Sequence, residues 1–144
     1  MNFIKQNSDY ALRMIVNLAQ AYQRDEVVSA HKLAEEEEVS PQFTAKILQK
    51  LAKADLIESL MGPTGGYKLK RHPEEISMAQ VIVGMQGPVC LNKCSPGIAS
   101  CPRQPRCPIS RIVCELESDI VKKLSNISIK DIIENKGKGF NDGR

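Results

Sequence analysis

The sequence has 144 residues, of which 42% are hydrophobic, and this length is typical of a single domain with one core. Its formal net charge of +3 is too small to identify a nucleic-acid binder by itself. The first residues lack the apolar centre of a signal peptide, and no later stretch approaches the roughly 18 apolar residues of a membrane-spanning helix. We therefore expect a cytoplasmic protein with no membrane partner.

Two amphipathic segments open the chain. In residues 8–22 the apolar side chains recur at spacings of three and four, which predicts a helix with one buried face. After a polar break, Ser29 is a suitable N-cap for a short second helix that ends near Val39. Both segments are expected to pack on the same core.

The segment VSPQFTAKILQKLAKADLI predicts a third helix directly after the second. Ser40 can cap it, and Pro41 suits its first position. The residues expected to face the core are Phe43, Ile47, Leu48 and Leu51. Those expected on the other faces are Gln42, Thr44, Lys46, Gln49, Lys50 and Lys53. Two short helices joined by a tight turn indicate a helix-turn-helix, although an ordinary helical hairpin has the same pattern.

The next stretch, LIESLMGPTGGYKLKR, decides between these two interpretations. Alternating side chains on both sides of a glycine-rich turn predict a β-hairpin with basic arms. A hairpin directly after a helix-turn-helix is a wing, and residues 40–71 carry six basic side chains against two acidic ones. The combination favours a winged helix-turn-helix that binds DNA.

The predicted DNA contacts come from the third helix and the wing. Gln42 and Thr44, near the helix start, are candidates for base edges, and lysines are candidates for phosphates. The glycines allow the hairpin backbone to approach a phosphate or a narrow minor groove. The full set is Ser40, Gln42, Thr44, Lys46, Lys50, Gly65, Gly66 and Lys68.

Beyond the wing, Ser77 begins a further apolar helix that ends between Gly84 and Pro88. Pro108 can open a long helix in which seven apolar residues repeat at three and four, namely Ile109, Ile112, Val113, Leu116, Ile120, Val121 and Leu124. Because so small a chain has little core left to receive this helix, the stripe favours a homodimer. Ser128 and Asp131 resemble the capping box of a short terminal helix.

These elements predict a mainly α fold with a small β-hairpin wing, built as a winged helix-turn-helix domain plus a long dimerisation helix. Residues 1–88 form the DNA-binding region with its connecting helix, and residues 89–107 form a cysteine segment. Residues 108–134 form the dimerisation helix and the terminal helix, and residues 135–144 form a flexible tail.

All five cysteines lie in CLNKCSPGIASCPRQPRCPISRIVC, a stretch without acidic residues. In a reducing compartment such clustering favours a metal site over disulfides. Cys94, Cys101 and Cys107 place three soft ligands on an irregular segment, which suits an iron-sulfur cluster. Zinc ligands usually stand two to four residues apart, and only Cys90 and Cys94 are that close. Cys107 precedes Pro108, so the positive end of the long helix favours its thiolate.

These thiols are also compatible with functions other than holding an iron-sulfur cluster. A winged-helix regulator with a zinc or metal-free thiol switch is the main alternative. An iron-sulfur electron-transfer protein is less favoured because it leaves the wing unexplained. A thiol oxidoreductase finds no support, since the chain has no Cys-x-x-Cys pair and no histidine near the thiols in sequence. We therefore expect no enzymatic activity.

Four stretches, SDYALRMIVNLA, VSPQFTAKILQKLAKADLIES, GPTGGYKLKR and CSPGIASCPRQPRC, stand in the order seen in the Rrf2 family of winged-helix regulators. The resemblance covers nearly the whole chain and is closest to the NsrR-type branch, which senses nitric oxide. It implies that Cys94, Cys101 and Cys107 hold an iron-sulfur cluster. It also implies that Asp9, supplied by the dimer partner, is the fourth ligand.

Two features keep the ligand set open. Asp9 also suits the amino end of a helix simply by its charge. The gap after Cys94 is longer than is typical of the NsrR-type branch, so Cys90 is an alternative ligand, and we interpret Cys114 as a structural thiol. The two-iron and four-iron forms of the cluster both remain open.

The residues and the resemblance together predict an iron-sulfur cluster-dependent transcriptional regulator. We interpret it as a repressor that binds palindromic double-stranded operator DNA as a homodimer. The expected signal is nitric oxide, the redox state or the supply of iron-sulfur clusters.

Overall fold

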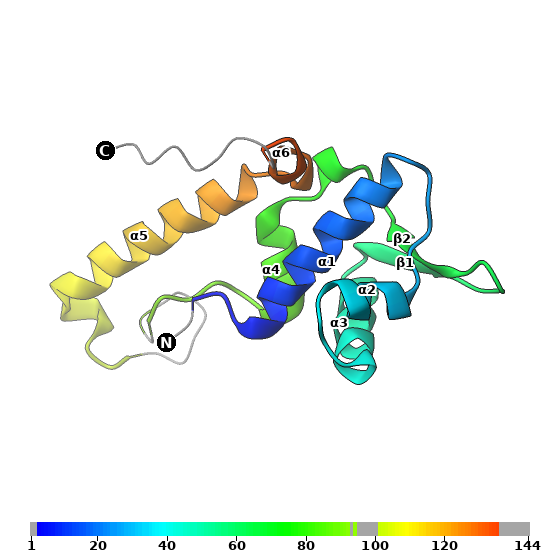
Figure 1. Ribbon diagram of the computed structural model, residues 1–144. Helices are drawn as coiled ribbons and strands as arrows, with labels where there is room; N and C mark the ends of the chain where they lie inside the picture. The colour runs from blue at the N-terminus through cyan, green and yellow to red at the C-terminus, as the bar shows by residue number, and fades with distance from the viewer. Residues whose placement is uncertain (1–2, 93, 95–100, 136–144) are drawn as a thin grey trace.

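The computed structural model describes residues 3–92, 94 and 101–135. Figure 1 shows a helical body from which a two-stranded hairpin projects at one end and a long helix at the other. The elements in chain order are α1 (Gln6–Tyr22), α2 (Ala30–Glu36), α3 (Pro41–Lys53), β1 (Ile57–Leu60), β2 (Gly66–Leu69), a 3-10 turn (Pro73–Glu75), α4 (Met78–Gln86), a second 3-10 turn (Gln104–Arg106), α5 (Pro108–Ser125) and α6 (Ile129–Glu134). The predicted fold class, mainly α with a β-hairpin wing, is confirmed.

Helix α1 lies at the centre of the core. Eight of its residues are buried, and it packs against α3, α4, α6 and β2. Its first turn is joined to the end of α4 through Gln86, whose side-chain oxygen accepts hydrogen bonds from the Lys5 amide and the Ser8 hydroxyl at 2.9 and 2.7 Å. The core therefore fixes α1 and α4 against each other at the end next to the cysteine segment.

Helices α2 and α3 form the predicted helix-turn-helix. Ser29 caps α2 by accepting a hydrogen bond from the Lys32 amide, and Ser40 caps α3 by accepting one from the Phe43 amide, each at 3.2 Å. Because both caps satisfy amides that a helix start leaves unpaired, they fix where each helix begins.

Strands β1 and β2 pair antiparallel, with Glu58 opposite Lys68 and Leu60 opposite Gly66. The segment between α1 and α2 joins the hairpin, since Val28 and Tyr67 exchange two backbone hydrogen bonds of 2.8 and 3.0 Å. The wing is thus held by the core at its base.

The C-terminal elements are attached to the body through α6 and through α5. Ser77 and Ser128 form a backbone bridge, and each caps its own helix through a capping box, α4 and α6 respectively. Helix α5 packs against α4 and otherwise extends away from the body (Figure 1). Only Ser110 and Glu117 of its residues are buried.

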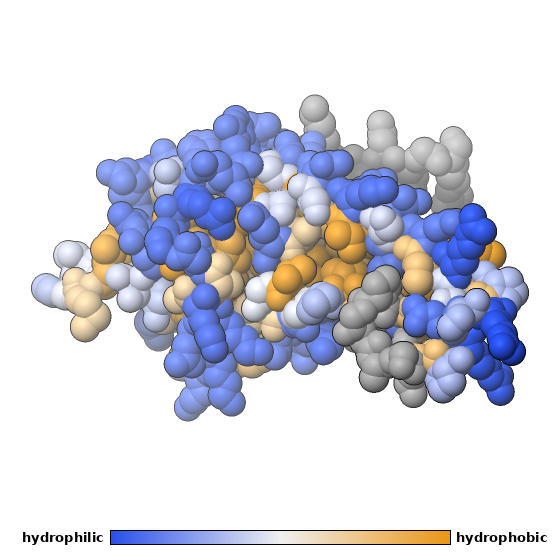
Figure 2. Space-filling view, turned by 180° about the vertical axis from the view of Figure 1, so that it is seen from behind, coloured by the Kyte–Doolittle hydropathy of each residue, from blue (hydrophilic) through white to orange (hydrophobic). Residues whose placement is uncertain are grey.

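Apolar surface remains where α4 and α5 meet. A groove of about 250 Å³ there is lined by Glu117 and by apolar side chains: Ala79, Val83, Pro88, Val89, Val121 and Leu124. On the face shown in Figure 2, hydrophobic residues gather near the middle and hydrophilic residues surround them. The contact of α5 with its own protomer therefore leaves part of the apolar surface open.

The predicted tail and the expected absence of a membrane-spanning helix can be compared only with the residues that the structure describes. The predicted tail, residues 135–144, lies outside them except for Asn135. Among the helices of residues 3–92, 94 and 101–135, none combines the length and the hydropathy needed to cross a membrane.

Candidate nucleic-acid interface and cysteine segment

The outer face of α3 is polar and basic. Gln42, Lys46, Gln49, Lys50 and Lys53 are all exposed, and the helix contains no acidic residue. A helix with this surface, placed second in a helix-turn-helix, suits the major groove of DNA, where amide side chains read base edges and lysines meet phosphates.

Thr44 was predicted on this exposed face, and that prediction is wrong. Its side chain is fully buried, and among the described residues its hydroxyl has no hydrogen-bond partner. The reason is helical spacing, because Thr44, Leu48 and Leu51 stand at i, i+4 and i+7 on the face that packs into the core. Phe43, which was assigned to that face, is half-buried, packs against the core and meets the Tyr10 ring edge-on at 5.4 Å.

Two of the lysines assigned to phosphates also have partners inside the protomer. The Lys50 ammonium donates a hydrogen bond to the Met85 carbonyl at 3.4 Å, at the end of α4. The Lys68 ammonium lies 3.4 Å from a Glu58 carboxylate oxygen directly across the hairpin. These contacts orient both side chains before any DNA arrives.

The wing glycines have a role within the hairpin itself. A Cβ at Gly65 would lie 2.2 Å from the Leu60 carbonyl oxygen, and one at Gly66 would lie 2.5 Å from the Val28 carbonyl oxygen. Larger residues therefore cannot fit either position without moving the backbone. The need for glycine here is explained by the hairpin and its neighbour, without any reference to DNA.

An ion pair ties the wing to the end of α3. Asp55, just after α3, accepts a hydrogen bond from the Lys70 ammonium just after β2. That hydrogen bond, with the charge of the ammonium, lowers the pKa of Asp55 below its ordinary value. The pair therefore connects the end of the wing to the end of α3.

The cysteine segment leaves α4 and returns to the start of α5. All five cysteines are free thiols; Cys94 is buried, whereas Cys90, Cys101, Cys107 and Cys114 are half-buried. Cys107 occupies the N-cap position of α5 without a capping side-chain hydrogen bond. The amino end of α5, with its partial positive charge, therefore lies next to this thiol.

Among the described residues, no three side chains of the types that bind metals are close enough to hold an ion. Asp9, the predicted fourth ligand, is an exposed residue in the first turn of α1, where it forms an ion pair with Arg13 at 3.2 Å. The described part of one protomer thus does not bring Asp9 and the cysteines together.

Sequence reasoning missed the side chains that hold this segment on α5. Glu117 is buried, and its carboxylate accepts a hydrogen bond of 2.8 Å from the Leu91 amide. The Gln104 side chain donates to the Cys94 carbonyl at 3.0 Å. One signal was available: Ser110, Cys114, Glu117 and Val121 repeat at four, three and four, which marks a second face of α5 opposite the exposed Ile109, Ile112 and Leu116.

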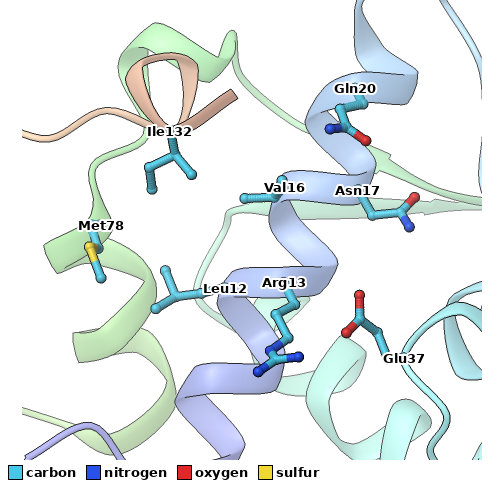
Figure 3. A pocket seen from close by; sticks show the side chains of 8 residues that line it. All are labelled: Leu12, Arg13, Val16, Asn17, Gln20, Glu37, Met78 and Ile132. Carbon is cyan, nitrogen blue, oxygen red and sulfur yellow. The ribbon is translucent and has the colours of Figure 1, made fainter. Parts of the chain in front are cut away.

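A shallow groove runs beside α1. It has a volume of about 410 Å³ and an apolar floor made by Leu12, Val16, Met78 and Ile132, which face one another in Figure 3. Asp9 lies one turn before Leu12 and Arg13, so the groove continues the same side of α1 on which Asp9 stands. An external apolar partner can approach this side of the helix.

Known proteins show the same sequence pattern and fold. The sequence model of the Rrf2 family, described as an iron-dependent transcriptional regulator, matches residues 4–135. The regulator NsrR of Shouchella clausii is 26% identical over 130 residues, which cover 90% of this chain and 87% of that protein. The regulator IscR of Aliivibrio salmonicida is 31% identical over 124 residues, which cover 86% of this chain and 73% of that protein.

Among solved structures, CymR (YrzC), described as the global cysteine regulator of B. subtilis, superimposes with a TM-score of 0.78 at 20% identity. The match covers 93% of this chain and 98% of CymR. The family match spans the helix-turn-helix, the wing, the cysteine segment and both C-terminal helices. The chain therefore belongs to the Rrf2 family of DNA-binding transcriptional regulators and not to a family of enzymes.

Proposed function

We propose that the protein is an iron-sulfur cluster-dependent transcriptional regulator that represses its targets and binds palindromic operator DNA as a homodimer. One observation carries this proposal, namely the order of the elements along the chain. A basic winged helix-turn-helix is joined through α4 to the cysteine segment. That segment ends at the N-cap of α5, a largely exposed helix. A chemical change at the cysteines can therefore alter the distance between the two DNA-binding domains of a dimer.

The proposed DNA interface consists of the outer face of α3 and the wing. Gln42 reads base edges, Lys46 and Lys50 meet phosphates, and Ser40 fixes the start of the helix. The wing contributes Lys68 and the backbone at Gly65 and Gly66. In a dimer the two α3 helices meet half-sites about one helical turn, or about 34 Å, apart or a multiple of that.

The proposed dimer forms through the outer stripe of α5. Ile109, Ile112 and Leu116 are 64%, 57% and 53% exposed, and they lie on one side of the helix. So much exposed apolar surface in one line is typical of an interface. The groove beside α1 offers an apolar surface of matching character for a second copy, on the side of α1 that carries Asp9.

The residues proposed to hold the cluster are Cys94, Cys101 and Cys107, with Cys90 as the alternative ligand and Asp9 of a second copy as the fourth. The donor chemistry fits: free thiols of this kind are the ligands that iron-sulfur clusters use, and the partial positive charge at the amino end of α5 would offset the charge of an anionic cluster held by Cys107. When bound, the cluster supplies iron that a small molecule such as nitric oxide or oxygen can attack. A carboxylate ligand leaves one iron more easily reached.

The test of the cluster is oxygen-free purification and reconstitution, followed by iron and sulfide analysis. We expect iron and sulfide to accompany the wild-type protein and to be lost from Cys101→Ser and Cys107→Ser. Cys114→Ser is the matched control, because it removes a thiol outside the ligand set. Wild-type protein that stays iron-free after reconstitution, or a Cys107→Ser variant that keeps the full content, would overturn the cluster.

The test of DNA binding is the salt dependence of operator affinity. Lys50→Ala is expected to weaken all operator sequences alike and to reduce the slope of log affinity against log salt by about one. His31→Ala, an exposed change on α2, is the control and should leave the slope unchanged. A loss confined to one base position would show that Lys50 reads a base.

The test of the dimer is analytical ultracentrifugation. Leu116→Glu places a charge in the outer stripe and is expected to give monomers. Ser118→Glu is the matched control, because it adds the same charge at an exposed position on another side of α5, and it should remain dimeric. A monomeric wild-type protein, or a dimer that Leu116→Glu leaves intact, contradicts this interface.

The alternative function is a thiol switch without iron. It is favoured by one observation: Cys114, which lies outside the proposed ligand set, contacts another cysteine residue of the segment. Iron-free protein whose operator affinity changes on thiol oxidation alone would support it.

A further inference from the structure

Cys114 and Cys94 are brought together by the fold. The Cys114 thiol donates to the Cys94 carbonyl oxygen, with 3.5 Å between sulfur and oxygen. These two residues are separated by 20 positions in sequence, so the contact is made by tertiary packing and not by chain proximity. Neither residue forms a disulfide in this structure.

Two further hydrogen bonds hold Cys94 in this position. The same carbonyl accepts a hydrogen bond of 3.0 Å from the Gln104 side chain, and three residues earlier the Leu91 amide donates to the Glu117 carboxylate at 2.8 Å. Glu117 stands one turn after Cys114 on α5. The backbone at Leu91, three residues before Cys94, is therefore fixed to the same face of α5 that presents Cys114.

Cys114 stays accessible when α5 is used for dimerisation. At about 3.6 residues per turn, it lies on the side of α5 opposite Ile109, Ile112 and Leu116. Its side chain is half-buried, whereas Cys94 is only 8% exposed. An oxidant from solvent therefore meets Cys114 before it meets Cys94.

We propose that Cys114 and Cys94 are a redox pair, which a peroxide converts into an intramolecular disulfide in the metal-free protein. A carbonyl oxygen lies about 2.4 Å from its own Cα, so the Cys114 sulfur is within about 6 Å of the Cys94 Cα. The Cys114 Cα lies about 2.8 Å from its own sulfur, so the two Cα atoms lie within about 9 Å of each other, and disulfides usually join Cα atoms about 4.4–6.8 Å apart. Side-chain rotation and a backbone movement at Cys94 close the remaining distance.

The chemistry balances with peroxide as the only co-reactant. The Cys114 thiolate attacks one peroxide oxygen, the O–O bond breaks, and a sulfenic acid and a first water result once protons are taken up. The Cys94 thiolate then attacks the sulfenic sulfur, the S–O bond breaks, and a second water leaves. Two thiols lose two protons and two electrons, and one peroxide becomes two waters.

This pair would deepen the proposed function by adding a second state of the same segment. The inference about regulation rests on that function, because Cys94 is one of the proposed cluster ligands. A sulfur in a disulfide cannot ligate iron, so the disulfide and the cluster exclude each other. Oxidation of the metal-free protein would then hold the segment on α5 until a thiol reductant releases it.

The experiment uses full-length protein, reduced and freed of metal with a chelator. One equivalent of hydrogen peroxide is added, thiols are blocked with N-ethylmaleimide, and the linked peptides are mapped by mass spectrometry without reduction. We compare wild type with Cys114→Ser and with Cys90→Ser, a matched control that removes a thiol outside the pair.

Wild type and Cys90→Ser are expected to give a Cys94–Cys114 link within the chain. Because a thiol of the same chain acts at an effective concentration of about 1 mM or more, the link should form about 100-fold faster than links between chains at about 10 μM protein. Cys114→Ser should instead accumulate sulfenic acid or links between chains. A dominant Cys101–Cys107 link, or a disulfide that forms in Cys114→Ser at the wild-type rate, would overturn the proposal.

Reconstitution separates this proposal from the proposed function. Oxidised wild type is expected to take up no iron until dithiothreitol is added, and reduced Cys114→Ser is expected to take up the wild-type amount. If metal-free protein forms the link but reduced protein never takes up iron, the cluster is wrong and the redox pair stands. If iron binds and no Cys94–Cys114 link forms, the redox pair is wrong and the cluster stands.

Discussion

Helices α1 and α5 have nearly the same length and very different surroundings. The 17 residues of α1 include eight that are buried, most of them apolar, whereas the 18 residues of α5 include two, Ser110 and Glu117, both polar. Apolar side chains of α5 such as Ile109 and Leu116 remain exposed. The protomer therefore buries most of the apolar face of α1, whereas it covers only part of the apolar surface of α5, through packing on α4 and the buried Glu117.

This difference has a functional meaning within the proposed function. The DNA-binding domain is built on a closely packed, rigid core, because large side chains such as Ile15, Leu51 and Ile82 are fully buried there. The sensing part ends at a helix whose exposed apolar side chains leave surface open to a partner. Parts of low local stability are the ones that a ligand or an oxidant can shift.

The largest effect is expected from one substitution made in both regions. Leu51→Ala removes a fully buried side chain and should lower the free energy of unfolding by about 2–5 kcal/mol. Leu116→Ala, at a side chain that is 53% exposed, should cost far less in dilute, monomeric protein. Denaturant unfolding measures both values.

Protein concentration sharpens this first comparison. If α5 dimerises, the cost of Leu116→Ala should grow as the concentration rises, because the dimer stabilises the folded state by mass action. The cost of Leu51→Ala should rise little with concentration by comparison. Equal costs for the two variants in dilute protein would contradict the difference between the two regions.

The next effect concerns the attachment of α5. Glu117→Ala leaves the Leu91 amide without its charged acceptor and is expected to destabilise the fold by about 1–3 kcal/mol. Hydrogen exchange at the Leu91 amide should accelerate, whereas exchange in the middle of α1 should change only with global stability. Glu117→Gln is the matched control, since it keeps an acceptor oxygen and should retain most of the protection.

A smaller effect of opposite sign is expected at Thr44. Its buried hydroxyl has no partner among the described residues, so Thr44→Val replaces an unpaired polar group by a methyl group of the same shape. Removing such a group should raise the free energy of unfolding by about 1 kcal/mol. Operator affinity should not change; a loss of affinity limited to one base pair would restore Thr44 to the DNA interface.

Thr44 and Glu117 also show where sequence reasoning succeeds and where it stops. Ser29 and Ser40 were predicted as caps because capping is local chemistry between residues three positions apart. Thr44 was misassigned because its hydroxyl was given more weight than its helical spacing to Leu48 and Leu51. Glu117 was missed because its partner is a backbone amide 26 positions away, which no side-chain pattern encodes.

The predicted cysteine site depends on the same distinction. The sequence identifies which side chains have the chemistry of cluster ligands, since donor type is a property of each residue. It does not encode which of them meet, and the contact of Cys114 with Cys94 appears only in the folded chain. Asp9 illustrates the limit, because its only described ion pair is with Arg13 on its own helix.

The smallest effect is expected where the wing meets α3. Hydrogen bonding to the Lys70 ammonium lowers the pKa of Asp55, so the pair stabilises the fold above the ordinary aspartate pKa of about 3.9, and this stability is lost as the pH falls through the lower folded value. Asp55→Asn is the suitable change, because Asp55 has a positive φ of 63° and asparagine tolerates that conformation. Wild type should unfold at slightly higher denaturant concentration than Asp55→Asn at pH 7, and this difference in midpoint should vanish well below pH 4.

Because the pair is exposed, 1 M salt should also reduce the difference in midpoint, which we call the gap. A gap that persists at pH 2 would show that Asp55 stabilises the wing without its charge.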